Sequence, residues 1–480
     1  MYSPFFCVWG TVTNLSRKYS VSRQFIYNEK HKLEYLISNS LNDNNLDKAK
    51  LKRTHVLKQI FSLRLNAKSS IIGISEYLHH FENQFNSVGF ISQVLKKAGQ
   101  IVGDKLDIDL PETLTIPVCC DEIFARQTPI LVTIEPKSMA IIGLKLANGR
   151  KALDWIEFWQ HIKNQNIEFS TLINDDGVGM KSAKEKFLQQ TPRQRDTFHT
   201  VSHRLGLWKT RFEAAAYNAI EHEYNCLECL KKTTSKKIQQ KRQNNYTQAL
   251  VKTQQAVDLY EQFTFLYHCL LECFECFDKN GKLKDLQKVT DDFITALELL
   301  NTLKIDGINQ EIKHINKDLE ELFYYYHTAQ SIVNELSTKI DPDILNQLCL
   351  AWQVHKKILK TKQINRSNAL KRKEQYLLQT AKEFLEDKFE PTINQVYKEL
   401  NNINQSSALV ECINSLLRPY LNTSKNQPTQ EMLNLFMFYH NHRRFAAGER
   451  KDKSPMELLT EKAQTKDWLE LLMEKVQSFC

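Results

Sequence analysis

Three carboxylates stand in settings where they could bind divalent cations. Asp121 ends the apolar run in TLTIPVCCDEI, Asp175 follows the run in FSTLINDDG, and Glu411 lies within the helical pattern SSALVECINSLLRPYL. Mg²⁺ and Mn²⁺ prefer oxygen ligands and usually take only a few carboxylates, which leaves positions open for water and phosphate. Two such ions about 4 Å apart can activate a nucleophile and stabilise the leaving oxygen of a phosphodiester. The sequence therefore predicts a site for two Mg²⁺ or Mn²⁺ ions, with these acids as its catalytic and metal-binding residues.

Alternating strand and helix patterns position the first two acids. Residues 116–120 are apolar or small and predict a buried strand that reaches the edge of its sheet at Asp121. TPILVTIEPKSMAIIGLKLANG predicts two further strands, KALDWIEFWQHIKNQN a helix, and FSTLIN the strand that ends at Asp175. Ligands bind at strand ends in α/β sheets. The order strand, strand, strand, helix, strand resembles an RNase H-like core.

The third acid shares a helix face with two other polar residues. Glu411, Asn414 and Arg418 fall at positions i, i+3 and i+7 of one predicted helix. We expect this face to bring the Glu411 carboxylate to the metal ions, with Asn414 as an auxiliary residue. The guanidinium of Arg418 is suited to bind a phosphate.

The acids and the C-terminal sequence together resemble a DDE-type transposase of a bacterial insertion sequence. The tail QEMLNLFMFYHNHRRFAAGERKDKSPMELL is similar to the ending of many such transposases and integrases, with the matching residues Tyr439, Asn441, Arg443, Ser454, Pro455, Glu457 and Leu458. The resemblance covers about residues 112–190 and 405–460. It implies magnesium-dependent DNA recombination, in which the element's ends are cut and transferred to target DNA.

Asp176 is the alternative to Asp175 as the second acid. Only one of two successive side chains at a strand end can point toward the metal ions, because successive side chains face opposite ways. The family pattern of two apolar residues, one small polar residue and then the acid favours Asp175.

Residues 190–405 predict an all-α insertion, because prolines and glycines are rare there and apolar residues recur at helical spacing. Near its start, Asp196 and His199 resemble the acid-or-cysteine, two residues, histidine signature of hAT, Mutator and related transposases. That resemblance implies a pair near the active site that helps to position the DNA end. An ordinary i, i+3 helix contact is the alternative. Trp208 and Trp352 either stack on an extruded base or belong to the core.

The first hundred residues are the expected DNA-binding part. Residues 1–103 hold 14 Lys and Arg against 6 Asp and Glu, a net +8 of the chain's formal +9. VTNLSRKYSVSRQFIYNEK predicts a helix-turn-helix, with Ser20 in the tight turn and Ser22 as the N-cap of a recognition helix. The candidates for major-groove contacts are Arg23, Gln24, Tyr27 and Asn28. A solvated helix face is the alternative.

A second helical unit follows the first. VLKQIFSLRLNAKSSIIGISEYLHHF predicts amphipathic helices, and Ser87 caps SVGFISQVLKKAG, a helix expected to end at Gly99. It resembles the second half of the paired helix-turn-helix heads of transposases. This resemblance implies DNA contacts from Ser87, Lys96 and Lys97.

The eleven cysteines include two Cys-x-x-Cys pairs, Cys226 with Cys229 and Cys273 with Cys276, a spacing that invites a zinc site. Both pairs lie in helical sequence, where Cys269, Cys273 and Cys276 share one face like small core residues. We therefore expect core packing rather than zinc.

The fold expected is a multi-domain α+β protein: N-terminal helix-turn-helix domains and an RNase H-like α/β core interrupted by a large all-α insertion. The expected boundaries are 1–50 and 51–105 for the two DNA-binding units, 110–190 for the first part of the core, 190–405 for the insertion and 406–480 for the C-terminal core helices with Glu411. No apolar run approaches a membrane span, and the opening residues lack a secretory signal. We expect a bacterial, cytoplasmic, nucleoid-associated protein.

The function expected is that of a transposase acting on double-stranded DNA, namely terminal inverted repeats and target DNA. Because both ends of an element have to be held together, we expect a homodimer or a higher oligomer. One alternative is a catalytically inactive, transposase-derived DNA-binding regulator. The other is an RNase H-fold nuclease without strand transfer.

Overall fold

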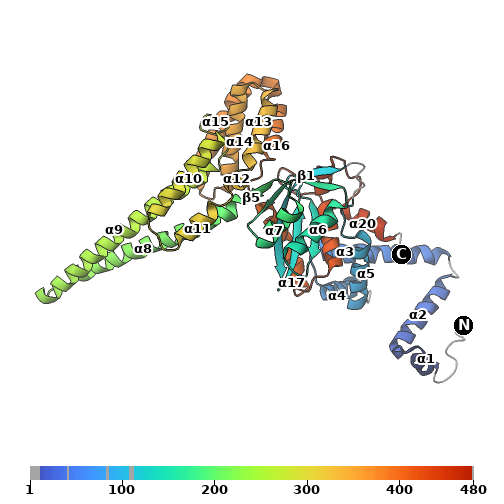
Figure 1. Ribbon diagram of the computed structural model, residues 1–480. Coiled ribbons are helices and arrows are strands. Elements are labelled where there is room, and N and C mark those ends of the chain that lie inside the picture. Colours follow the sequence, from blue (N-terminus) through green and yellow to red (C-terminus); the bar gives the residue numbers. More distant parts are fainter. Residues whose placement is uncertain (1–10, 41–42, 83–85, 108–112, 478–480) are drawn as a thin grey trace. The chain divides into compact units, whose positions relative to one another are not determined.

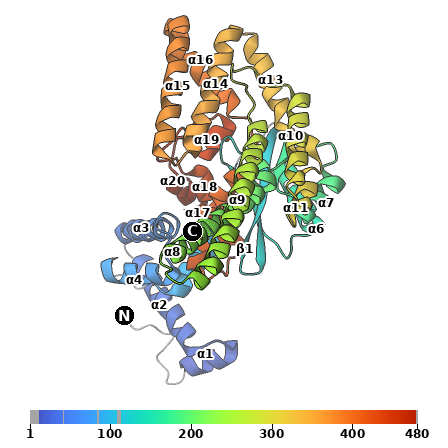
Figure 2. The same ribbon diagram turned by 90° about the vertical axis from the view of Figure 1, so that its left-hand side faces the viewer.

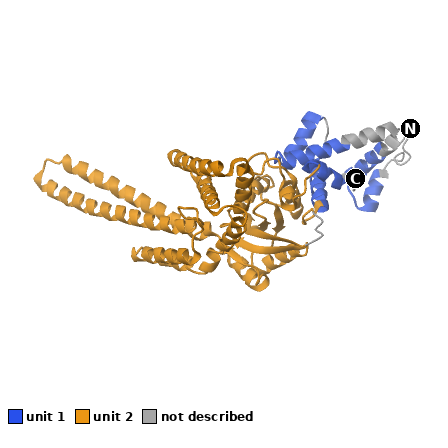
Figure 3. Cartoon of the chain, turned by 90° about the horizontal axis from the view of Figure 1, so that it is seen from above, with its two compact units in different colours: residues 1–101, 466–480 blue, residues 102–465 orange. Residues whose placement is uncertain are grey.

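The structure is a computed structural model that describes residues 11–40, 43–82, 86–107 and 113–477. Residues 1–10, to which the expectation about a secretory signal applies, lie outside these ranges. The chain forms two compact units, residues 1–101 with 466–480 and residues 102–465 (Figure 3). The protein is a mostly helical α+β molecule with one mixed sheet of five strands in its described part. The last fifteen residues, expected with the core, belong to the first unit.

Short helices build the described part of the first unit: α1 (Thr11–Tyr19), α2 (Arg23–Ser40), α3 (Asp43–Leu65), α4 (Ile71–Glu82), α5 (Val88–Val102) and α20 (Trp468–Gln477). The expected turn and cap between α1 and α2 are present, since Ser20 has a φ of 54° and the Ser22 hydroxyl accepts the Phe25 N–H at 3.0 Å. The prediction that α5 ends at Gly99 is wrong. Gly99 is buried inside the helix, and the backbone turns at Gly103, where φ is 69°.

One mixed sheet with the strand order β3-β2-β1-β4-β5 is the centre of the second unit. β1 is antiparallel to β2 and parallel to β4, and β4 is parallel to β5. Three strands, a helix and a fourth strand follow one another as expected. The fifth strand falls inside the region predicted to be helical, because three polar residues show no strand periodicity. The strands are β1 (Leu114–Ala125), β2 (Thr128–Ile134), β3 (Ile141–Leu146), β4 (Ile167–Asn174) and β5 (Arg193–Arg195).

Helices cover both faces of this sheet. Phe158 of α6 packs close to β3 because Gly143 has no side chain; a Cβ at that position would lie 2.8 Å from the Phe158 ring. Cys120 belongs to the buried cluster formed with α6, whereas Asp121, facing the other way, contacts α17. The helices around the sheet are α6 (Ala152–Lys163), α7 (Val178–Phe187), α17 (Ala408–Thr423), α18 (Gln430–His442) and α19 (Pro455–Thr460).

Side-chain amides of α18 seal the outer edge of β3. Asn441 Oδ1 accepts the Ile141 N–H at 2.8 Å, and Asn441 Nδ2 donates to the Ile141 carbonyl at 2.9 Å. Gln430 makes the same pair of bonds further along, with Leu146 N–H and the Leu144 carbonyl, both at 2.8 Å. An edge strand otherwise presents unpaired backbone groups. The two amides therefore take the place of a further strand.

The chain between β5 and α17 forms the expected helical insertion, with a buried apolar core of its own. α8 and α9 run side by side as an antiparallel pair (Figures 1 and 2), in which Thr253 Oγ1 donates to the Ala219 carbonyl at 3.0 Å. In the described ranges, no helix is long and apolar enough to cross a membrane. The elements are a π-helical turn η1 (Phe198–His203), α8 (Arg204–Lys231), α9 (Lys236–Cys273), α10 (Leu286–Thr302), α11 (Ile308–Ile315), α12 (Leu319–Leu322), α13 (Tyr325–Ser337), α14 (Pro342–Lys360), α15 (Ile364–Leu385), a 3₁₀ turn η2 (Glu386–Lys388) and α16 (Phe389–Leu400).

The edge bonds give a stability prediction. Asn441→Leu keeps the side-chain size but leaves the Ile141 N–H and carbonyl without partners, so we expect the free energy of unfolding to fall by about 2 to 4 kcal/mol. Urea unfolding followed by circular dichroism measures this loss. Gln379→Ala, which removes an exposed amide bonded to Glu383 in α15, is the control and should cost no more than about 0.5 kcal/mol. Equal losses in both variants would contradict the assignment.

Candidate active site

The register of the sheet brings the first two acids to the same level. β1 and β4 are parallel, and their last paired residues are Cys119 and Ile173. Asp121 lies two residues beyond Cys119 within β1, and Asp175 lies two residues beyond Ile173, just past the end of β4, so the two acids are at the same level along the strands. The prediction that the strand ends at Asp121 is wrong. β1 continues to Ala125 along β2, and only its pairing with β4 has ended.

Other acids crowd Asp121. Burial, together with the charges of Asp175, Glu411 and Glu122, raises the pKa of its carboxyl from 3.8 to about 7, although the Glu122 N–H donated at 2.8 Å acts in the opposite direction. Glu411 lies in the first turn of α17 and is exposed. Asn414 follows on the same helix, is buried, and donates Nδ2 to Asp121 Oδ2 at 3.0 Å. The fold thus places Asp175 and Glu411 near enough to Asp121 for their charges to act on it, and Asn414 in direct contact with it.

The donor set suits a hard cation without forming a closed cage. Carboxylate oxygens are the ligands that Mg²⁺ and Mn²⁺ prefer, and a divalent charge would offset the repulsion around Asp121. Within the part of the chain that the structure describes, no three His, Cys, Asp or Glu side chains converge closely enough to hold a metal ion. The buried Oδ1 of Asn414 has no hydrogen-bond partner there and is a further oxygen donor. Arg418 of the same helix is exposed.

The neighbouring acids Asp175 and Asp176 have different surroundings. Asp176 accepts hydrogen bonds from Arg195 Nε at 2.8 Å, Arg195 Nη2 at 2.7 Å and Arg193 Nη2 at 3.1 Å. Burial alone would raise the pKa of the Asp176 carboxyl, but the two guanidinium groups hold it well below its usual range. Both acids line a groove, but Asp175 Oδ1 accepts the Gly177 N–H at 2.9 Å rather than a guanidinium. Asp176 is therefore engaged in a buried ion-pair network, and Asp175 is the acid available to a ligand.

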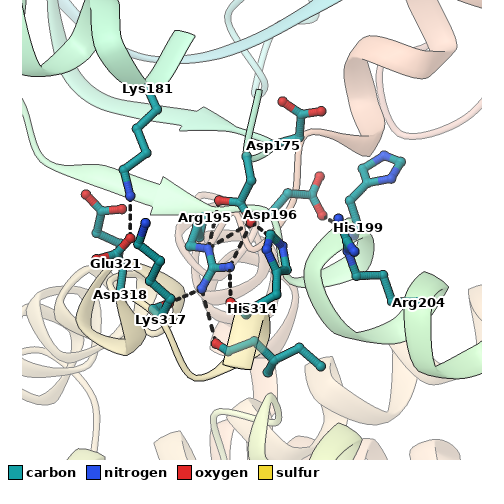
Figure 4. A network of polar contacts seen from close by, with 12 residues as sticks. Asp175, Lys181, Arg195, Asp196, His199, Arg204, His314, Lys317, Asp318 and Glu321 are labelled. Carbon is teal, nitrogen blue, oxygen red and sulfur yellow. Dashed lines mark hydrogen bonds and ion pairs between the residues drawn. The ribbon is translucent and has the colours of Figure 1, made fainter. Parts of the chain in front are cut away.

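Arg195 fastens the insertion to the sheet (Figure 4). Its buried guanidinium also donates to the carbonyls of His314 at 2.9 Å, Ile315 at 3.2 Å and Lys317, where α11 ends. The last carbonyls of a helix lack intrahelical donors. Arg195 satisfies them and balances its own charge with Asp176, so one side chain joins β5, β4 and α11.

A groove of about 1010 Å³ opens beside Asp175 and mixes basic with aromatic side chains. In α8, the Arg211 guanidinium lies 5.3 Å from the centre of the Trp208 ring, and both residues line the groove. Trp208 is half-buried there. Trp352, the other candidate for base stacking, is buried in the insertion core, where its Nε1 donates to Asn401 Oδ1 at 2.9 Å.

The Asp196 side chain contacts the backbone of His199, not its ring. The buried Asp196 Oδ1 accepts the His199 N–H at 2.8 Å, which is the local i, i+3 contact considered above. The His199 ring lines the groove together with that of His203. Asp196 Oδ2 accepts both the N–H and the hydroxyl of Ser407, at 2.8 and 2.6 Å. Asp196 thus touches the insertion's first turn and the start of the helix that carries Glu411.

Two charged residues beside the site, Glu122 and Arg150, belong to no sequence motif that would have marked them as functional. Burial raises the pKa of the Glu122 carboxyl, and Arg150, with Nη1 at 2.9 Å from Glu122 Oε1, lowers it. Both line the groove with Asp175. Arg150 comes from the loop after β3, so only the fold reveals this pair.

The expected DNA-contacting residues of the first unit are all exposed: Arg23, Gln24, Tyr27, Asn28, Ser87, Lys96 and Lys97. On α2, Gln24 Nε2 donates to Asn28 Oδ1 at 3.2 Å, so the two amides form one polar surface. The Ser87 hydroxyl accepts the Phe90 N–H at 3.1 Å, as an N-cap does.

The Cys-x-x-Cys pairs lie in helical surroundings. Cys273 and Cys276 are buried in the insertion core, as expected, and burial raises the pKa of their thiols to about 11 and about 12. α9 ends at Cys273, so Cys276 follows the helix rather than sharing its face. Cys226 is half-buried and Cys229 is exposed.

Comparisons with known proteins assign the chain to no family, because it matches no protein-family model and no curated protein. Function therefore has to be inferred from the site itself. A cluster of carboxylates beside a groove with arginine, histidine and tryptophan side chains can hold a cation and a polyanion next to each other.

The opposite pKa shifts of Asp121 and Asp176 give a second prediction. The pKa of Asp121 is higher in the folded than in the unfolded protein, so the folded protein binds this proton more tightly. The free energy of unfolding therefore falls as the pH rises from about 4 to about 7. In metal-free buffer above pH 7, Asp121→Asn should therefore raise the unfolding free energy by a few kcal/mol, at about 1.4 kcal/mol per pKa unit.

Asp176→Asn is the matched control with the opposite sign. The lowered pKa of Asp176 means that its charge stabilises the native state above the ordinary pKa of 3.8, and that this stability is lost as pH falls toward the folded pKa. The variant should lose stability at pH 7. Thermal unfolding between pH 4 and pH 8 tests both; a loss of stability in Asp121→Asn would contradict the account of the site.

Proposed function

We propose that the protein is a DDE-type transposase that binds the terminal inverted repeats of its element and uses two divalent metal ions for DNA strand cleavage and strand transfer. The observation that carries this proposal is the common level of Asp121 and Asp175 beyond the β1–β4 ladder, with Glu411 added by α17. The strand order β3-β2-β1-β4-β5, followed by a helical insertion before α17, supports an RNase H-like core.

Each residue of the site has a role in this proposal. Asp121, Asp175 and Glu411 hold the ions, and Asn414 orients the Asp121 carboxylate through its 3.0 Å bond. When bound, two Mg²⁺ or Mn²⁺ ions supply Lewis-acid activation of the attacking water or 3′-hydroxyl and of the leaving oxygen. The basic side chains of the groove bind the DNA backbone beside the acids.

The first unit supplies recognition of the element's ends. The net charge of residues 1–103, which is +8, favours binding to a polyanion, and α2 presents Arg23 and Gln24, which can form paired hydrogen bonds with base edges. Because two ends have to be joined to one target, the working form is at least a dimer. The resemblance to transposases of bacterial insertion sequences supports a bacterial source, and a DNA substrate supports a nucleoid-associated location.

Removal of single carboxylates tests the chemistry. Asp121→Asn, Asp175→Asn and Glu411→Gln should each lower Mg²⁺-dependent nicking by at least about 100-fold, because each removes a ligand that stabilises developing charge. The substrate is a supercoiled plasmid with the DNA that flanks the gene, and binding to it should be unchanged. Glu213→Gln, an exposed acid on α8, is the control and should cut normally.

The outcomes separate the alternatives. Undiminished nicking by the three variants would sink the assignment of the acids. Nicking by the wild-type protein without joining to a second plasmid would favour a nuclease without strand transfer. Tight, metal-independent binding without any nicking would favour an inactive DNA-binding regulator.

The two kinds of DNA contact make a further prediction. Arg211→Ala, at the groove, should weaken binding to all sequences alike and reduce the salt dependence of the affinity by about one charge. Arg23→Ala, on α2, should instead reduce the preference for the flanking repeats by about 1 to 3 kcal/mol. Fluorescence anisotropy at several salt concentrations measures both. The same pattern of loss in both variants would contradict the division of roles.

A further inference from the structure

One buried carboxylate receives hydrogen bonds from the beginnings of two helices. Asp196 is fully buried after β5 and accepts the His199 N–H with one oxygen and the Ser407 N–H and hydroxyl with the other. His199 belongs to η1, which continues into α8, and Ser407 is the residue that precedes α17. The first N–H groups of a helix lack intrahelical acceptors and carry partial positive charge. A carboxylate therefore satisfies both helix starts at once.

Neighbouring bonds reinforce this junction. The N–H and the hydroxyl of Thr197 both donate to the Gln405 carbonyl at 3.0 Å, and Gln405 Nε2 donates to the Phe274 carbonyl at 2.7 Å. Residues 196–197 and residues 405–407, which these bonds join, lie more than 200 residues apart in the sequence. η1 is a π-helical turn, a local widening that is frequent at functional sites.

The junction sets where α17 begins, and α17 carries the site's third acid. Glu411 follows Ser407 by about one helical turn, and Asn414 lies almost one turn further, in contact with Asp121. Glu411 is exposed and lies in the first turn of this helix. The position of its carboxylate relative to Asp121 therefore depends on how the first turn of α17 is held.

We propose that Asp196 is a positioning residue: it fixes the first turn of α17, and with it Glu411, against the helix α8 that lines the groove. This inference rests on the proposed function for its activity readout only. Asp196 is not expected to touch the metal ions or the DNA, because both of its oxygens are occupied by Ser407 and His199. An asparagine offers only one acceptor oxygen, so it can serve one helix start but not both.

The test compares Asp196→Asn and Ser407→Ala with Thr197→Val. The first two loosen the start of α17; the third removes one hydroxyl bond of the same junction without touching α17. At saturating DNA, Asp196→Asn should cut about 100-fold more slowly, the loss typical of a reacting group displaced by about 1 Å. The KM for DNA should not change, because the groove residues are intact. Thr197→Val should cut at the wild-type rate, and Ser407→Thr should restore what Ser407→Ala loses.

Hydrogen exchange supplies a readout that does not require activity. In Asp196→Asn and Ser407→Ala, the amides of residues 408–412 should exchange faster than in the wild type, with those of α6 unchanged. Mn²⁺ binding, followed by electron paramagnetic resonance, should weaken in the same two variants. Ser407→Ala keeps its backbone bond to Asp196 and covers the case in which Asp196→Asn does not fold.

The outcomes distinguish this inference from the proposed function. Wild-type cutting and exchange in Asp196→Asn would overturn the inference and leave the proposed function standing. If the wild-type protein does not cut DNA, the proposed function fails, and exchange alone decides the inference: unchanged exchange at 408–412 overturns it. A raised KM with an unchanged rate at saturation would also overturn it, since it would assign Asp196 to DNA binding.

Discussion

Repulsion among the carboxylates around Asp121 is the constraint that the second unit has to withstand. Burial and the neighbouring charges of Asp175, Glu411 and Glu122 all disfavour ionisation of Asp121. Left to itself, such a cluster would push its strands and helix apart. The surrounding structure opposes this with bonds that are short and buried: amides along β3, guanidinium groups behind β4, and a carboxylate at the start of α17. Under the proposed function, this frame would hold the like charges in place until multivalent cations offset them.

The adjacent residues Asp175 and Asp176 have two different roles: one is a candidate acid of the site, and the other anchors the helical insertion. Asp176 pairs with Arg195, which also binds the end of α11, whereas Asp175 accepts the Gly177 N–H at 2.9 Å; both residues line the groove. The two carboxylates differ because alternate residues at a strand end face opposite ways. Sequence reasoning could name this alternation and prefer Asp175, but the partner that occupies Asp176 comes from β5, which has no signal in the sequence.

Local features of the chain could be predicted, and contacts between distant segments could not. The strand through Asp121, the strand that ends just before Asp175, the turn at Ser20 and the cap at Ser22 follow from residue types within a few positions. By contrast, Ser407 meets Asp196 across 211 residues, and no periodicity links them.

Several residues of the C-terminal run on which the resemblance rests have structural roles. Asn441 completes the edge of β3, and Glu457 forms a capping box with Ser454 and an ion pair with Arg444, 3.1 Å away. These residues hold the frame of the site rather than line it. Their pattern can be recognised in the sequence because the residues are close together in the chain. Their structural role depends on contacts with the sheet, which the sequence does not show. The junction of Asp196 and Thr197 with residues 405–407 extends this logic to the insertion, whose two ends are pinned together. Because the ends are fixed, the length between them adds only a slowly growing closure entropy, and the core can carry a large helical insertion without losing the alignment of its acids.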